Sequence, residues 1–239
     1  MTTIKNWLNK VFSRTNSDKE LPEAVRRSIE LEYPSNLGFT VRQRQLYPSS
    51  SLADRYKKIH RLYPQPLNSL LDLSCSKGYF VFAAAAEKTC ERALGIDVYQ
   101  PDLQVCQILK QYINSHNTQF ENLRLMELSN NISNWGSAFQ TVLLINSYQY
   151  LFFGSDRESE GYLDHDKIFA AIHKICSKRF IFSNRVEVND CQNQDAVKKA
   201  GLIAKNYNRE AILDALSRYF TLISETQLGK YPLWKLEAK

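Results

Sequence analysis

Hydrophobic and polar positions follow two alternating patterns from residue 67 to residue 220. Short apolar runs such as SLLDLS (69–74) have no polar face, which is typical of strands buried on both sides of a parallel sheet. Between these runs lie longer segments whose apolar residues recur at helical spacing. The patterns predict strands at 69–74, 92–98, 122–128, 139–153 (apolar core 142–145) and 179–187, and helices at 79–90, 101–116, 165–176 and 209–220.

The pattern changes near the C-terminus. Residues 221–238 predict two strands joined through Gly229, which is a hairpin instead of a helical crossover. Strands that alternate with helices indicate a parallel sheet with helices on both faces. We therefore expect an α/β fold: a doubly wound, mostly parallel seven-stranded sheet that ends in an antiparallel hairpin.

The first 66 residues differ from the rest, and we expect two parts: a helical N-terminal extension or cap at 1–66 and the main domain at 67–239. Helices are predicted over 4–14 and 25–34. The first has one apolar face with lysines opposite. Such a helix caps its own domain, binds a partner helix or contacts a membrane surface through residues 4–12.

Composition narrows the class of protein. Of 239 residues, 44% are hydrophobic, which is enough for a sizeable core. No apolar run reaches the roughly 20 residues that span a bilayer, and we expect no secretory signal. The five cysteines are scattered and never form a C-x-x-C pair. We therefore expect no zinc site, no disulfide framework, no bound metal and a cytoplasmic location.

The net charge of +6 is compatible with an anionic acceptor, including RNA. The densest basic stretch, RYKKIHRLYP (55–64), interleaves tyrosines with cations, as in some proteins that bind single strands. Its other interpretation is the solvated face of a helix.

The turn after the first predicted strand carries the most specific polar pattern. Asp72, Ser74, Ser76 and Gly78 have the spacing D-x-S-x-S-x-G, which is D-x-G-x-G-x-G with serine at the first two glycine positions. The dinucleotide fingerprint G-x-G-x-x-G has a different interval. Serine lacks the access of glycine to positive φ, so this turn is a modified ligand loop or an ordinary connection.

Two other strand ends carry polar groups. Asp97 ends the second strand, where a carboxylate is suited to bind a ribose diol, and Asn146 ends the fourth. In an open α/β sheet, ligands bind outside the carboxyl ends of the strands. We therefore expect Asp97 and Asn146 to lie beside the serine-containing turn.

The segments LLDLSCSKGYF (70–80), LGIDV (94–98) and VLLINSYQYLF (142–152), followed by a terminal hairpin, resemble class I S-adenosylmethionine-dependent methyltransferases over roughly residues 67–239. The resemblance implies S-adenosylmethionine as the cofactor, with Asp97 at its ribose and Glu127 and Leu128 near its adenine. It places these residues at the methionine end: Asp72, Ser74, Ser76 and Gly78. Residues 150–187 and 207–220 are similar to bacterial small-molecule or saccharide O-methyltransferases.

Methyl transfer from a sulfonium mainly requires alignment and exclusion of water. A base is needed only for a weak nucleophile such as a hydroxyl. The resemblance places Asn146 near the transferring methyl, so we expect it to serve both cofactor binding and catalysis. His165 is the expected base, although it is also read as a polar residue at a helix start. His173 and Glu187 are further candidates.

The leading hypothesis is an enzyme that transfers a methyl group to an undetermined acceptor, such as a hydroxyl on a small molecule or saccharide. The alternative is a catalytically silent methyltransferase-like scaffold that binds a partner or RNA through residues 1–66, including the basic stretch. A nicotinamide-dependent oxidoreductase is disfavoured, because the glycine spacing is wrong and no Tyr-x-x-x-Lys follows the fourth strand. The sequence does not predict an oligomeric state.

Overall fold

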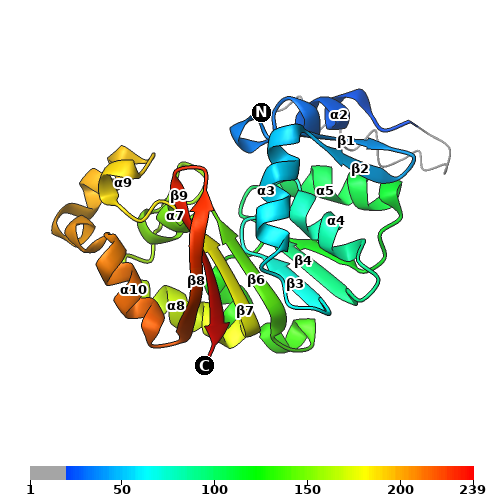
Figure 1. Cartoon of the computed structure of the whole chain (residues 1–239). Coiled ribbons are helices and arrows are strands. Elements are labelled where there is room, and N and C mark those ends of the chain that lie inside the picture. Colours follow the sequence, from blue (N-terminus) through cyan, green and yellow to red (C-terminus); the bar gives the residue numbers. More distant parts are fainter. Residues whose placement is uncertain (1–19) are drawn as a thin grey trace.

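The computed structural model describes residues 20–239, so the helix predicted over 4–14 lies outside the described residues. Its centre is a seven-stranded sheet with the order β5-β4-β3-β6-β7-β9-β8 (Figure 1). The parallel strands are β3 (Ser69–Asp72), β4 (Arg92–Ile96), β5 (Thr118–Glu121), β6 (Phe139–Ile145) and β7 (Cys176–Ser183).

The C-terminal hairpin completes the sheet. Strands β8 (Phe220–Leu228) and β9 (Tyr231–Ala238) are antiparallel, and β9 lies between β7 and β8. Gly229, in the connecting turn, has a φ of +66°, a value that glycine adopts readily. These findings confirm the predicted fold class.

Helices cover both faces of the sheet. Leu70 joins the apolar cluster under α3, α4 and α5, whereas Leu71 joins the cluster under α8 and α10, because successive side chains of a strand point to opposite faces. Figure 1 shows these two helix layers on either side of the strands. The helices are α2 (Glu23–Glu30), α3 (Ser50–His60), α4 (Tyr79–Ala85), α5 (Gln100–Ile113), α6 (Leu125–Asn130), α7 (Tyr148–Phe153), α8 (His165–Ile175), α9 (Gln194–Ala200) and α10 (Arg209–Ser217), with 3₁₀ turns η1 (Pro34–Asn36), η2 (Ile132–Trp135), η3 (Val188–Asp190) and η4 (Gly201–Asn206).

Residues 20–66 pack on the sheet through the α4 and α5 side. Ile29, Phe39 and Leu52 are at most 1% exposed and belong to the same apolar cluster as Leu70. This part also contains a hairpin, β1 (Phe39–Arg42) with β2 (Gln45–Pro48), which we did not predict. Its turn has no glycine: Gln43 and Arg44 adopt φ values of +48° and +64°. The boundary at residue 66 stays a prediction.

The predicted third strand is wrong in position. The strand is β5, and residues 125–130 form α6 instead. The backbone N–H of Arg124 donates to the Glu127 carboxylate at 2.8 Å, which caps the helix start, and Leu125 and Leu128 bury one helix face. The fourth strand also ends earlier than predicted, since Asn146 has a φ of +64° and α7 begins two residues later. None of the described helices has both the length and the apolar character needed to cross a bilayer.

Candidate active site

A cavity of about 730 Å³ opens at the carboxyl ends of β3, β4 and β6. Strands β4 and β6 flank β3 on opposite sides, so the strand order reverses at this place, where open α/β sheets bind their ligands. A smaller cavity of about 180 Å³ adjoins it. Four of the residues predicted from sequence line the large cavity: Ser74, Ser76, Asp97 and Asn146. Asp72 lines the smaller one.

Residues 72–78, here called the serine loop, are hydrogen-bonded directly to Asp97. The backbone N–H of Ser76 donates to Asp97 Oδ2 at 2.9 Å, and the Ser76 hydroxyl donates to Asp102 at 2.9 Å. Ser76 has a φ of +46°, which is uncommon for a residue other than glycine. The hydrogen bond to Asp102 therefore anchors a serine in a conformation that normally favours glycine.

Gly78 lines neither cavity. It has a φ of +79° and precedes α4, and a Cβ atom there would lie 2.7 Å from the Phe120 ring. Gly95 is similarly constrained, since its Cβ would lie 2.7 Å from Cys75 Sγ. The structure therefore gives Gly78 a packing role at the start of α4, away from the cavity surface.

The Asp97 carboxylate can accept further hydrogen bonds. Its Oδ1 accepts the Tyr99 N–H at 2.9 Å and its Oδ2 accepts that of Ser76, which leaves a lone pair on each oxygen. Burial raises the pKa of Asp97, and the two N–H donors oppose this shift. Val98, beside it, is 37% exposed and lines the same cavity. A carboxylate next to an apolar surface suits a ribose carrying a base.

Asp72 and Arg55 place opposite charges in the smaller cavity. Asp72 is 4% exposed, and burial raises its pKa to about 7, opposed by the Ser74 N–H and by Arg55. Arg55 extends from α3, and burial lowers its pKa, opposed by Tyr33 and Asp72. Arg55 is part of the basic stretch at 55–64. The sequence pattern of that stretch did not show that Arg55 lines a cavity whereas Lys57 and Lys58 are exposed.

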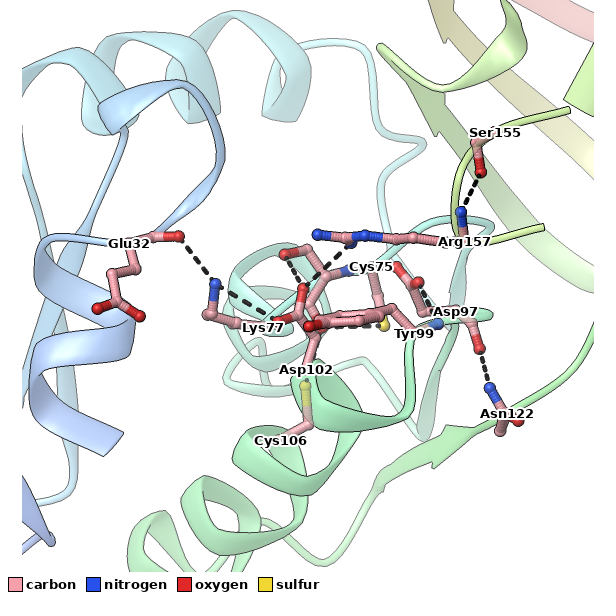
Figure 2. A network of polar contacts seen from close by, with 11 residues as sticks. Glu32, Cys75, Lys77, Asp97, Tyr99, Asp102, Cys106, Asn122, Ser155 and Arg157 are labelled. Atoms are coloured by element: carbon pink, nitrogen blue, oxygen red, sulfur yellow. Dashed lines mark hydrogen bonds and ion pairs between the residues drawn. The ribbon is translucent and has the colours of Figure 1, made fainter. Parts of the chain in front are cut away.

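A polar network extends beside the serine loop (Figure 2). Asp102 and Lys77 are both nearly fully buried, and the Lys77 Nζ lies 3.5 Å from Asp102. Arg157 approaches Asp102 at 3.9 Å, and its guanidinium lies 3.8 Å above the centre of the Tyr99 ring. Arg157 therefore fastens the loop between α7 and α8 to the Asp97 edge of the cavity. No sequence signal linked Arg157 to this place.

Asn146 lies on the border of both cavities. Its backbone N–H donates to the Ser183 carbonyl at 2.7 Å, which ties the end of β6 to β7. The hydroxyl oxygens of Ser147 and Ser74 are 2.5 Å apart, so the β6 end also contacts the serine loop. These bonds place Asn146 beside the loop, as expected from the strand ends; its role in catalysis stays a prediction.

His165 does not reach either cavity, which corrects its assignment as the base. It is 8% exposed, and its ring stacks on Phe152 at 4.3 Å. Both ring nitrogens are engaged, Nδ1 by the Tyr148 hydroxyl and Nε2 by the Asn206 carbonyl at 3.0 Å. Burial lowers the pKa of His165. His165, the first residue of α8, therefore lies in the buried aromatic core.

The residues expected near the adenine and the further candidates for the base also lie away from the cavities. Glu127 caps α6 and Leu128 is fully buried, so neither lines the cavity at the end of β5. The misplaced strand explains this error, because Leu123, Arg124 and Leu125 line it instead. His173 and Glu187 line neither cavity. Within residues 20–239, no three His, Cys, Asp or Glu side chains gather as metal ligands.

No family model matches the chain, and no curated protein matches it. Solved structures do match its fold. The N-terminal domain of EvdMO1 with SAH bound has a TM-score of 0.58 at 13% identity, covering 95% of this chain and 99% of that one. The N-methyltransferase NodS from Bradyrhizobium japonicum WM9, in complex with S-adenosyl-L-homocysteine, has a TM-score of 0.56 at 13% identity, covering 90% and 98%. The chain has the fold of the class I methyltransferases.

Proposed function

We propose that the protein is a methyltransferase that uses S-adenosylmethionine to methylate a small molecule or saccharide. One observation carries the proposal: the loop 72–78 and the Asp97 carboxylate meet on one cavity, joined by the hydrogen bond from Ser76. The S-adenosylhomocysteine bound in two structures of the same fold supports this choice of cofactor.

The residues present fit the parts of this cofactor. The free lone pairs of Asp97 are suited to the ribose hydroxyls. Val98, Leu123 and Leu125 form an apolar surface suited to adenine. In the smaller cavity, Arg55 is suited to the methionine carboxylate and Asp72 to its ammonium.

The bound cofactor supplies an activated methyl group on a sulfonium, so the protein mainly has to position the acceptor and exclude water. Asn146 and Ser147 border the place where the two cavities meet. Arg157, stacked on Tyr99, lines the cavity near Asp97, where it would shield a bound ribose from water. For a hydroxyl acceptor, the cavity offers the carboxylates of Asp156 and Asp195 as proton acceptors, besides those of Glu158 and Glu160, which are paired with Arg124.

Transfer of labelled methyl groups tests the proposal. The full chain is incubated with methyl-labelled S-adenosylmethionine and cell-extract fractions that contain small molecules, glycans, RNA or protein. Label in the small-molecule or glycan fraction supports the proposal. Label confined to RNA or protein overturns the acceptor class, and a complete lack of label overturns the transfer activity.

A catalytically silent scaffold is the second candidate, favoured by the two serines in the loop. This reading predicts that Asp97→Ala leaves the binding of RNA or a partner unchanged. Reversal of charge at Lys57 and Lys58, both exposed on α3, would abolish that binding. The methyltransferase proposal predicts the opposite pattern.

A further inference from the structure

Arg185 lines the smaller cavity together with Arg55 but has no assigned role. Within residues 20–239, no carboxylate lies within ion-pair distance of either guanidinium. The Arg185 Nε is buried and has no hydrogen-bond partner. An unpaired buried donor of this kind is costly, because it has lost water without a replacement.

The backbone around Arg185 is held firmly. Asn184, which precedes it, is 1% exposed, accepts the Tyr148 N–H at 2.8 Å and donates to the Leu144 carbonyl at 2.7 Å. The Arg185 carbonyl accepts the Tyr207 hydroxyl at 2.7 Å. The guanidinium lies 4.7 Å from the centre of the Tyr231 ring, at the turn of the terminal hairpin. Arg185 is therefore a preorganised cation.

The two arginines serve different sides of the cavity. The charge of Arg55 lowers the pKa values of Asp72 and Tyr33, near the serine loop. Arg185 follows the end of β7, its guanidinium lies against the Tyr231 ring of the terminal hairpin, and its charge lowers the pKa values of Tyr150 and Tyr207. Under the proposed function, Arg55 serves the methionine end of the cofactor, which leaves Arg185, after the end of β7, for the acceptor.

The charges lining this cavity do not balance. The two guanidiniums meet one carboxylate, Asp72. The cofactor of the proposed function adds an ammonium, a sulfonium and a single carboxylate. Positive charge therefore remains in excess within the smaller cavity after the cofactor binds, whereas the carboxylates of Asp97, Asp156 and Asp195 line the adjoining large cavity. An anion beside Arg185 would offset this local excess.

We infer that the acceptor carries an anionic group, a carboxylate or a phosphate, which Arg185 binds beside the transferring methyl. This inference rests on the proposed function. The planar guanidinium suits two-pronged recognition of either group. Tyr150 and Gln192, whose side chains are joined at 2.8 Å, line the same wall and complete a polar surface for the rest of the acceptor.

Nuclear magnetic resonance of the arginine Nε–H groups tests the inference. Full-length protein with ¹⁵N-labelled arginine is saturated with S-adenosylhomocysteine and titrated with acetate, inorganic phosphate or neutral acetamide at constant ionic strength. Arg185→Lys assigns the Arg185 signal. We expect this signal to shift saturably with acetate or phosphate and not with acetamide, and the tighter anion identifies the group.

Two variants separate the anion site from the cofactor site. Arg185→Gln should weaken binding of the anion at least tenfold and change the Kd of S-adenosylhomocysteine less than twofold. Arg55→Gln, the matched control, should show the reverse. The same titration is repeated without S-adenosylhomocysteine. An anion shift seen only in its absence would assign Arg185 to the cofactor carboxylate and overturn the inference, as would no shift in either state. Failure of S-adenosylhomocysteine to bind would overturn the proposed function, and the inference with it.

Discussion

Single residues explain how a loop with two serines keeps its shape. Ser76 adopts a positive φ, and its hydroxyl donates to the buried Asp102. The sequence identified the loop by its spacing, but it did not identify Asp102, because one aspartate near a helix start is common and the partner lies 26 residues away.

Substitutions at residue 76 separate these two effects. Ser76→Ala loses the hydrogen bond and keeps the strained φ, whereas Ser76→Gly loses the bond but relieves the strain. We expect the alanine variant to be the less stable of the two by about 1 kcal/mol, measured by urea unfolding. Equal free energies of unfolding would contradict a strained residue 76.

The pH dependence of stability tests the burial of Asp72. Its pKa rises from 3.8 to about 7 on folding, so the folded state binds more protons in this range. The free energy of unfolding therefore decreases as the pH rises from about 4 to about 7, by at most about 1.4 kcal/mol per pH unit for this group. Urea unfolding of the wild type and Asp72→Asn between pH 4.5 and 6.5 measures the difference.

Because Asp72→Asn cannot ionise, its advantage over the wild type should grow with pH. Asp54→Asn, at an exposed position on α3, is the control and should follow the wild type. A constant difference across the range would show that Asp72 titrates normally.

At the scale of elements, the apolar runs at 69–74 and 92–98 were sufficient to find β3 and β4, since both are buried on two faces. Strand β5 alternates buried and exposed residues over only four positions, so the more apolar segment of α6 was mistaken for it. The hairpin β1–β2 was missed because its turn contains neither glycine nor proline.

The connection between α7 and α8 is the element most open to test. Arg157 fastens it over Tyr99 and near Asp102. Arg157→Ala should raise the Kd of S-adenosylhomocysteine about threefold, which corresponds to a half-exposed cation–π contact of roughly 0.5–1 kcal/mol. The melting temperature should fall by at most about 2–4 °C, the shift that about 1 kcal/mol produces in a chain of this size. Arg218→Ala, on an exposed ion pair with Asp166, serves as the control for calorimetry, and equal Kd values for both variants would refute the fastening role.

At the scale of the whole molecule, the alternation of strands and helices predicted the doubly wound sheet and the edge where the cavity opens. Four residues of the large cavity could be predicted because they lie at or just after the ends of predicted strands, so their positions can be read from the local sequence. The arginines at 55, 157 and 185 come from helix α3 and from two loops that are distant from it in sequence, and only the tertiary packing brings them to the cavities. The buried position of His165 could not be predicted for the same reason: its neighbours in sequence are polar, and only the tertiary packing places it in the core.

Titration calorimetry with S-adenosylhomocysteine tests the central claim, that the serine loop and Asp97 form one cofactor site. The wild type should bind, and Asp97→Ala should raise the Kd at least tenfold, because two hydrogen bonds to a carboxylate are lost, each contributing about 1.5–3 kcal/mol. Asp97→Asn, which retains an acceptor oxygen, should fall between them, and Asp54→Ala should match the wild type. No heat from the wild type at millimolar ligand, or equal affinity in Asp97→Ala, would contradict the account.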